Sequence, residues 1–478
     1  MTLCTQYVIS IQNLYCFLRG ISVNLSGKKI GIWGYGIVGK SATRYLQQLS
    51  CTLTVCDQRA CSPEEQAYLD AHQVPFYAQD NLSLFLETND YIIPSPGIDI
   101  SSYTHFAHKW ISELDIFAQA WHKPIIAITG TVGKTTVTHL IGLLLQHARI
   151  RAIVGGNIGY GMLSLIEAQK NVDYAVLELS SWQLEYNTLC APTIALWTTF
   201  AENHLDRHIT MQRYFDAKYQ IIAQQTKEQT AIIPLILMHD IYARNPQSRC
   251  IFFYHGLPDK STYMNIKKED TLWYFDNNAF YAVTNNNMRC IATSITLPEY
   301  SFASNWIAIA ALLHTLSLPI HLINHLDRNT CTQPHRFELI GTYNGITIYN
   351  DSKATTAIST IASVNKCVGK RIHLILGGLS KGVDRTPLIQ TIKDTVHTIY
   401  CFGKESDILK SICNQLNIQS YAFDTLEKTV KTCIKNCQPE DIILFSPAGS
   451  SYDLFKDYAD RGECFKNSIK EELLQVKR

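Results

Sequence analysis

Short apolar runs, glycine-containing turns and amphipathic helical patterns alternate along this chain in three segments. The first segment runs from KKIGIWGYGIVGKSATRYLQQL into CTLTVCD, and the second begins at KPIIAITGTVGKTTVTHLIGLLLQHA. The third begins near RIHLILGG and includes TIYCFG and DIILFSPAG. Strands that alternate with helices in this way are typical of parallel sheets. The pattern therefore predicts an α/β protein with three domains, each built on a mainly parallel sheet with flanking helices.

The 478 residues are too many for one hydrophobic core, so several domains are expected. The pattern places the domain boundaries near residues 112 and 333, which gives domains 1–112, 113–333 and 334–478. Between about 225 and 300 the chain is polar and rich in asparagine, and TLWYFDNNAFYAV within it predicts a hairpin. No chemistry is assigned to that stretch.

Composition excludes several classes of protein. The 42 basic and 41 acidic side chains leave a net charge of +1, so nothing draws the chain generally toward nucleic acid or an anionic membrane. No apolar run is long enough to cross a bilayer, and residues 1–25 predict an extension with no signal-peptide pattern.

The 15 cysteines are scattered, which favours a reducing cytoplasm. Two cysteine groups, Cys51 with Cys56 and Cys61, and Cys433 with Cys437, lack C-x-x-C spacing, and no structural zinc is expected at either.

The first glycine loop, GYGIVG, follows an apolar run and precedes a helical pattern. Gly34, Gly36 and Gly39 match the dinucleotide fingerprint, and Asp57 ends the next predicted strand. The motif by itself admits three interpretations: NAD binding, binding of another nucleotide diphosphate at the helix N-terminus, or glycines that only allow a strand and a helix to pack.

The second glycine loop, TGTVGKTT, has the strand and helix context of a phosphate-binding loop. Backbone amides from Gly130 to Lys134 are expected to cradle phosphate, with Lys134 reaching the terminal phosphate and Thr135 binding magnesium. The leading glycine of the usual motif is replaced by Ile128. The loop is therefore a variant form, or else a chance Gly-Lys-Thr turn.

Two more apolar runs end in polar groups that suit the same site. YAVLELSSWQLE is apolar until Glu178, and TIALWTTFAENHLDRH is apolar until the cluster that begins at His204. Ligands gather at the carboxyl ends of parallel strands, and a magnesium ion between phosphates needs one or two carboxylates. Glu178 is the candidate, whereas His204 on its own is more typical of a hydrogen-bonded loop histidine.

Motifs in all three segments resemble those of the Mur ligase family, ATP-dependent amide-forming enzymes of peptidoglycan synthesis. The phosphate loop without its leading glycine is similar to that family's form, and the motifs most resemble those of members that add D-glutamate. The resembling stretches are GNIG at Asn157, ELSSWQLE at Glu178, NHLDRH at His204, HRFE at His335, YNDSKATT at Lys353, LGG with Lys381, and SPAGSSYDLFKDYADRGECF from Ser446.

The resemblance implies a Rossmann-like N-terminal domain, a P-loop ATPase-like central domain and a Rossmann-like C-terminal domain. It implies ligation of D-glutamate to UDP-N-acetylmuramoyl-L-alanine with ATP and two Mg²⁺ ions, by a cytoplasmic monomer that serves cell-wall biogenesis, cell shape and cell division. Lys134, Glu178, His204 and Lys218 would be catalytic, and Lys218 matches a lysine that is carbamylated in the family. Thr135, Glu178, His204 and Lys218 would bind the metal.

The resemblance also implies the remaining binding residues. The UDP moiety would be bound by Ile37, Val38, Gly39, Asp57 and Arg59, and the sugar-peptide part by Asn157. ATP would be bound by Gly130, Thr131, Val132, Gly133, Lys134, Thr135, Thr136, Arg336 and Asp351. D-glutamate would be bound by Lys353, Thr355, Lys381, Ser451 and Tyr458.

The chain departs from the family pattern at a few positions. Val132 and Asn203 stand where the family usually has asparagine and aspartate, and Ala308 stands where a second asparagine is common. Ser380 precedes Lys381 where acidic or glycine residues are common. The alternatives that remain open are another Mur-type or folylpolyglutamate-type ligase, a nucleotide-dependent switch, and an NAD-dependent oxidoreductase based on GYGIVG alone.

Overall fold

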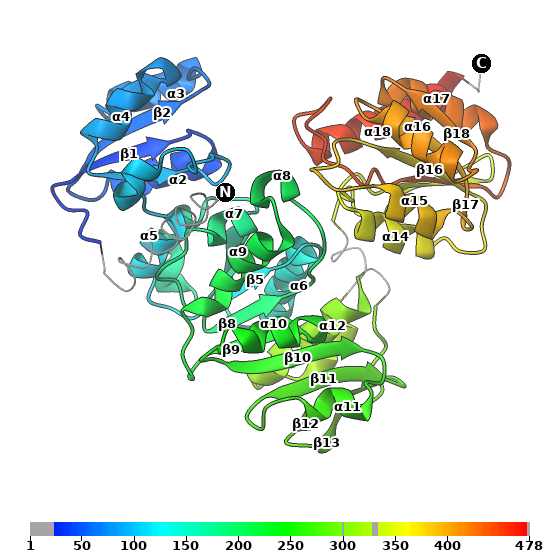
Figure 1. The fold of residues 1–478 in the computed structure, drawn as a ribbon, viewed down its shortest axis with the longest axis horizontal. Helices are drawn as coiled ribbons and strands as arrows, with labels where there is room; N and C mark the ends of the chain where they lie inside the picture. Colours follow the sequence, from blue (N-terminus) through cyan, green and yellow to red (C-terminus); the bar gives the residue numbers. More distant parts are fainter. Residues whose placement is uncertain (1–22, 299–300, 327–332, 476–478) are drawn as a thin grey trace, which may run out of the picture. The chain divides into compact units, whose positions relative to one another are not determined.

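The computed structural model describes residues 23–298, 301–326 and 333–475 (Figure 1). The chain forms two compact units. The first holds the described residues up to Thr199 together with Phe215–Leu326, and the second holds Phe200–Tyr214 together with the described residues from Gln333 onward. The expected extension over residues 1–25 lies almost entirely outside the described residues.

The N-terminal sheet has four parallel strands in the order β3-β2-β1-β4. Its strands are β1 (Lys29–Trp33), β2 (Thr52–Asp57), β3 (Phe76–Ala78) and β4 (Tyr91–Pro94). The helices of this part are α2 (Ile37–Leu46), α3 (Pro63–Ala71), α4 (Leu82–Thr88) and α5 (Glu113–Ala120), with 3-10 turns η1 (Gln79–Asn81) and η2 (Thr104–Lys109). The fingerprint glycines therefore follow a strand and open a helix, as the sequence predicts.

The central sheet has nine strands in the order β13-β12-β11-β10-β9-β8-β5-β7-β6. Pairing is parallel from β6 to β11, and β11, β12 and β13 form an antiparallel end that includes the expected hairpin. The strands are β5 (Ile125–Thr129), β6 (Ala152–Gly156), β7 (Tyr174–Glu178), β8 (Ile194–Trp197), β9 (Thr230–Pro234), β10 (Arg249–His255), β11 (Thr271–Asp276), β12 (Ala279–Thr284) and β13 (Asn287–Ala292).

Every residue of β5 is buried, as expected for a parallel strand covered on both faces. The apolar positions predicted on the following helix, Val137, Leu140, Ile141, Leu144 and Leu145, are all buried. The longer helices are α6 (Lys134–His147), α9 (Met211–Ala223) and α12 (Ala303–Thr315); the shorter ones are η3 (Met162–Asn171), α7 (Ser181–Leu184), η4 (Leu235–Leu237), α10 (Met238–Ala243), α11 (Lys260–Met264) and η5 (Ile320–His325).

The C-terminal sheet has six strands in the order β14-β15-β19-β16-β17-β18, parallel except for the β14–β15 hairpin. Leu374 and Leu376 pack into one core and Ile375 into another, because alternate side chains of a strand point to opposite faces. The strands are β14 (Glu338–Tyr343), β15 (Ile346–Asn350), β16 (Ile372–Gly377), β17 (Val396–Phe402), β18 (Ser420–Phe423) and β19 (Ile442–Phe445). The helices of the second unit are α8 (Leu205–His208), α14 (Ala357–Asn365), α15 (Thr386–Ile392), α16 (Ser406–Gln415), α17 (Leu426–Asn436) and α18 (Tyr458–Gln475).

Three α/β domains with mainly parallel sheets confirm the fold class predicted from the sequence. Within the described ranges, no helix is both long and apolar enough to cross a bilayer.

Candidate functional site

The phosphate loop joins β5 to α6, and its shape explains the missing glycine. Ile128 is a fully buried strand residue that pairs with Glu178 on one side and Leu196 on the other, so it is not part of the loop. Gly130 has φ +148° and Gly133 has φ +90°, conformations that side-chain-bearing residues rarely adopt. The loop therefore begins at Gly130 and is complete without a leading glycine.

Two threonines at the end of β8 hold the loop from the side. The amides of Thr131 and Val132 donate to the carbonyl and hydroxyl oxygens of Thr199, each at 2.8 Å. The hydroxyls of Thr198 and Thr199 donate to the carbonyl of Val132 at 2.5 and 3.0 Å. Two of the five amides expected to cradle phosphate are thus already bound within the protein. Among the described residues, no side chain caps the N-terminus of α6 at Gly133, so the first-turn amides of α6 are suited to an anion.

Two lysines converge on one carbonyl of this loop. The side-chain nitrogens of Lys134 and Lys218 donate to the carbonyl of Gly130 at 2.8 and 2.9 Å. Burial lowers the pKa of Lys218 well below its usual value, and the charge of Lys134 lowers it further, against the opposing effect of Glu178. Burial therefore shifts Lys218 toward its neutral amine, relative to an exposed lysine.

Glu178 is the last residue of β7, beside β5, as the sequence predicts. One carboxylate oxygen accepts a hydrogen bond from the side-chain amide of Asn157 at 3.0 Å. The other oxygen is buried and has no hydrogen-bond partner among the described residues. A buried carboxylate oxygen without a partner is a costly arrangement that a cation would relieve, so the residues present fit a hard divalent metal ion.

Asn305 lies close to the phosphate loop, although the sequence analysis gave it no role. It lies on α12 and is buried, and a Cβ at Gly133 would come within 2.9 Å of its side-chain oxygen, which has no hydrogen-bond partner among the described residues. Asn305 therefore lies against the phosphate loop. The only sequence signal was the family pattern around Asn305, which commonly has a second asparagine at position 308, where this chain has the fully buried Ala308.

His204 occupies an unusual backbone conformation with φ +55°, and its amide contacts the side-chain oxygen of Asn203 at 3.1 Å. It follows β8 by several residues and belongs to Phe200–Tyr214, which groups with the second compact unit. Its role beside the phosphate loop stays a prediction.

Of the two threonines that follow Lys134, Thr135 is half-buried, and Thr136 is buried with a hydroxyl that has no partner in the described part of the chain.

The N-terminal glycine loop is built around Asp57. Its carboxylate accepts hydrogen bonds from the amides of Tyr35 and Arg59 at 2.5 and 2.7 Å. Gly39 has to be glycine because a Cβ there would lie 2.0 Å from the carbonyl oxygen of Gly34. Ile37 to Gly39 form the first turn of α2. Arg59 forms two 2.9 Å hydrogen bonds with Glu65, so this predicted ligand is held by a neighbouring carboxylate.

The C-terminal domain places Asp351 and Lys353 directly after β15. Asp351 is buried, which raises its pKa, and its carboxylate accepts hydrogen bonds from Ser363, Ser446 and the amide of Phe337 at 2.6, 2.9 and 3.1 Å. Its predicted contact with a nucleotide would compete with these bonds. The positive charge of the preceding residue, Arg336, lowers the pKa of Asp351 and so opposes the effect of burial.

The predicted amino-acid site brings together residues far apart in the chain. The ammonium of Lys353 lies 4.9 Å from the ring centroid of Tyr458, the first residue of α18, and donates to Gln333 at 3.2 Å. Lys381 follows the carboxyl end of β16 with φ +56°, and Ser451 is buried after the carboxyl end of β19. The neighbouring ends of β15, β16 and β19 thus carry the candidates, and Thr355 is half-buried in the loop after β15.

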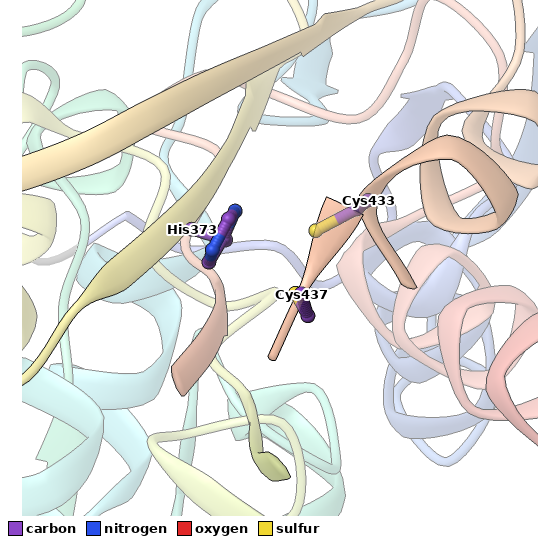
Figure 2. A group of neighbouring side chains, drawn as sticks. All are labelled: His373, Cys433 and Cys437. Atoms are coloured by element: carbon purple, nitrogen blue, oxygen red, sulfur yellow. The ribbon is translucent and has the colours of Figure 1, made fainter. Parts of the chain in front are cut away.

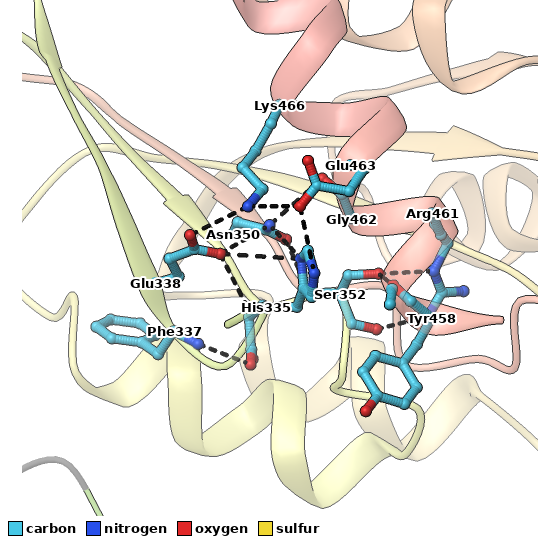
Figure 3. Close-up of polar contacts among 12 residues, drawn as sticks. His335, Phe337, Glu338, Asn350, Ser352, Tyr458, Arg461, Gly462, Glu463 and Lys466 are labelled. Atoms are coloured by element: carbon cyan, nitrogen blue, oxygen red, sulfur yellow. Dashed lines mark hydrogen bonds and ion pairs between the residues drawn. The ribbon is translucent and has the colours of Figure 1, made fainter. Parts of the chain in front are cut away.

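Arg461, which the sequence did not single out, joins these loops (Figure 3). It is fully buried, and its guanidinium donates to the hydroxyl and carbonyl of Ser352 at 3.1 and 2.7 Å and to the carbonyl of Gly449 at 3.0 Å. The Ser352 hydroxyl in turn donates to the carbonyl of Tyr458 at 2.7 Å. Burial lowers the pKa of Arg461 to about 9. Arg461 therefore fixes the loops that carry Lys353 and Ser451 to α18.

We expect Arg461→Ala to lower the free energy of unfolding by about 3 kcal/mol, because each buried acceptor left unsatisfied costs about 1–3 kcal/mol. Lys470→Ala, at an exposed position of the same helix, is the matched control and should change it by less than about 0.5 kcal/mol. Chemical denaturation of both variants provides the measurement. Equal stabilities would show that Arg461 does not hold these loops.

Comparisons with known proteins cover all three domains. The family models for the MurD-like N-terminal domain, the Mur ligase middle domain and the Mur ligase glutamate ligase domain match residues 28–108, 128–313 and 335–449. A curated UDP-N-acetylmuramoylalanine--D-glutamate ligase of Geotalea uraniireducens is 30% identical over 464 residues, which is 94% of this chain and 98% of that protein. The chain belongs to the Mur ligase family. A ligase with the same curated name from Haemophilus influenzae is 30% identical over 92% of this chain and 97% of its own.

Solved structures of the Mur ligase family show the same fold at low identity. MurF from Acinetobacter baumannii matches with a TM-score of 0.58 and 14% identity, covering 94% of this chain and 91% of that one. MurF from Thermotoga maritima, solved with ADP, matches with a TM-score of 0.55 and 16% identity, covering 89% and 96%. Membership of the Mur ligase family confirms the resemblance seen in the motifs. The GYGIVG loop lies within the MurD-like domain, so it no longer argues for an oxidoreductase.

Proposed function

We propose that this chain ligates D-glutamate to UDP-N-acetylmuramoyl-L-alanine with conversion of ATP to ADP and phosphate. The observation that carries the proposal is the similarity to curated D-glutamate ligases over more than nine-tenths of the chain. The reaction belongs to the synthesis of the peptidoglycan precursor, in the cytoplasm, and the enzyme acts as a monomer. The three domains, with boundaries near residues 112 and 333, divide the work between UDP-substrate, ATP and amino-acid binding.

Amide formation from a carboxylate is uphill in water, so the carboxylate must first become a better electrophile. The L-alanyl carboxylate attacks the γ-phosphate of ATP, which forms an acyl phosphate and releases ADP. The amine of D-glutamate then attacks the acyl carbon, and the tetrahedral intermediate expels phosphate. Lys134 and the first-turn amides of α6 offset the negative charge that gathers on the phosphate oxygens. In this proposal the protein mainly positions the reactants and stabilises charge.

Four residues would hold the Mg²⁺ ions: Thr135, Glu178, His204 and Lys218. When bound, Mg²⁺ would neutralise phosphate charge. The buried oxygen of Glu178 without a partner supports this assignment. Lys218 gains a carboxylate if its neutral amine attacks CO₂, which forms the N–C bond of a carbamate and releases one proton. Its lowered pKa supports that reaction, because it favours the neutral amine.

D-glutamate would bind at the ends of β15, β16 and β19. Lys353 and Lys381 supply positive charge for a dicarboxylate, and Thr355, Ser451 and Tyr458 supply polar contacts. The UDP moiety would bind at the N-terminus of α2 through Ile37, Val38, Gly39, Asp57 and Arg59, with Asn157 at the sugar-peptide part. Arg336 and Asp351 would contact the nucleotide.

The proposal is tested by phosphate release from ATP with UDP-N-acetylmuramoyl-L-alanine and magnesium. D-glutamate is added, omitted, or replaced by L-glutamate, D-alanine or meso-diaminopimelate. We expect release only with D-glutamate, together with a UDP-linked dipeptide of matching mass. Phosphate release with a different amino acid would support a ligase with another amino-acid substrate. Release that does not depend on any amino acid would favour a nucleotide-dependent switch.

A further inference from the structure

A second cluster of reactive side chains lies at the other end of the C-terminal sheet. His373 is the second residue of β16, Cys433 lies on α17, and Cys437 directly follows that helix. One ligand atom from each of the three side chains lies within 4.8 Å of the other two (Figure 2). His373 and Cys433 are buried and Cys437 is half-buried, so the cluster has one side toward solvent. None of the residues assigned to ligation belongs to this cluster.

We propose that His373, Cys433 and Cys437 form a binding site for a thiophilic divalent metal ion, with Zn²⁺ as the best match. Two sulfurs and one imidazole are a ligand set that zinc prefers over magnesium or calcium. Ligand atoms around a tetrahedral zinc ion lie about 3.3–3.8 Å apart, given its bond lengths of about 2.0–2.3 Å. Separations of up to 4.8 Å therefore require only small side-chain movements to close around the ion. Water supplies the fourth ligand through the half-buried side.

The surroundings of His373 resemble the outer shell of a metal site. The carboxylate of Asp441 lies 2.9 Å from Nε2 of His373, and it also accepts a hydrogen bond from the amide of Gln438 at 2.8 Å. A carboxylate that orients a ligating histidine is a common arrangement around metal ions. The hydroxyl of Tyr400 lies 3.2 Å from Nδ1, so the ring is held from both sides and a metal ion would replace one of these contacts. With the metal ion at Nδ1 in place of Tyr400, Asp441 stays on Nε2 and acts as a positioning residue.

The two thiols differ in state, because burial raises the pKa of Cys433 well above its usual value. Hydrogen bonds from Cys433 and His373 lower the pKa of Cys437 to about 6, in spite of burial. A thiolate at neutral pH is the form that binds metal ions.

The position of the cluster indicates a stabilising role rather than a catalytic one. His373 and Asp441 lie at the amino ends of β16 and β19, whereas Lys381 and Ser451 follow the carboxyl ends of the same strands. A metal ion here would join β16, the end of α17 and the turn before β19. Binding to the folded state alone raises the unfolding temperature. This inference does not depend on the proposed ligation reaction.

The direct test uses Co²⁺ as a spectroscopic substitute for Zn²⁺ on the chelator-treated chain, kept reduced with a phosphine. We expect one equivalent of Co²⁺ to give a near-ultraviolet thiolate charge-transfer band that Zn²⁺ abolishes and Mg²⁺ does not. Because the Mg²⁺ site offers no thiolate, this band separates the two sites. The absence of a thiolate band would overturn the proposal.

Variants locate the site. Cys437→Ser, at the half-buried position, should abolish most of the band, and Asp441→Asn should weaken the metal affinity about 10–100-fold. The matched control is Cys464→Ser on α18, whose thiol contacts Glu427 instead of the cluster. Loss of the band in Cys464→Ser, or its survival in Cys437→Ser, would place the metal elsewhere and refute the assignment.

Thiol mapping makes the same test in the unmodified chain, so it does not depend on how a variant folds. Zn²⁺ should protect Cys433 and Cys437 from alkylation, and a chelator should restore their labelling. Equal labelling of the two cysteines with and without Zn²⁺ would contradict the proposal. Protection that only a thiol reductant reverses would show that the two cysteines form a disulfide instead, which also overturns the metal site.

Discussion

Lys134→Ala is expected to lower phosphate release in the presence of all substrates by at least about 10²–10³-fold, the effect of removing one charge-stabilising donor from a reaction centre. The ammonium lies at the start of α6 and bonds the loop carbonyls of Gly130 and Thr131 at 2.8 and 3.3 Å. Bound phosphate would draw the same group toward its oxygens. The loss should appear mainly in kcat, because the interaction strengthens as charge develops on the phosphate.

Lys123→Ala is the matched control for this variant. Lys123 is an exposed lysine just before β5, at the opposite end of the strand that leads into the loop. Its replacement should leave kcat within about two-fold, which corresponds to a change of less than about 0.5 kcal/mol. Near-normal phosphate release by Lys134→Ala would remove this lysine from the reaction and, with it, the assignment of the loop as the ATP site.

The second large effect is expected at Lys218. Lys218→Met should lower phosphate release by about 10²-fold or more, because the carboxylate that the carbamate supplies would be lost. The same variant should be as stable as the unaltered chain or more stable, because methionine removes a buried amine, and Lys134 still donates to the carbonyl of Gly130. Rate and stability thus move in different directions, which a merely structural lysine would not produce.

Dependence on CO₂ separates the carbamate from other roles of Lys218. Preparation in CO₂-free buffer should lower the activity of the unaltered chain, and bicarbonate should restore it, whereas Lys218→Met should respond to neither. Lys227→Met, at an exposed lysine beyond the end of α9, controls for the loss of a positive charge in that region. Activity that stays constant without CO₂, together with full activity of Lys218→Met, would refute the carbamate.

The sequence by itself determined the secondary-structure elements and the strand ends at which candidate binding residues lie. The alternation of apolar runs and helices predicted parallel sheets, since a strand covered on both faces must be apolar throughout, as β5 is. The same reasoning placed Glu178 at the end of β7 and Gly130 at the start of the phosphate loop, because the strand pattern breaks at those positions. Such features are local, and the order of residues along the chain is enough to define them.

Only the tertiary structure decided which distant side chains meet. Thr199, just after β8, accepts hydrogen bonds from two loop amides, Lys218 reaches the carbonyl of Gly130 from α9, and Asn305 lies against Gly133 from α12. In the C-terminal domain, His373 meets a cysteine pair about sixty residues later in the chain, a pair whose spacing by itself gave no reason to expect a metal site. Sheet order and helix packing set these contacts, and neither is encoded in the spacing of residues along one segment. The sequence thus determined where the loops occur, and the packing of strands and helices determined which side chains complete them.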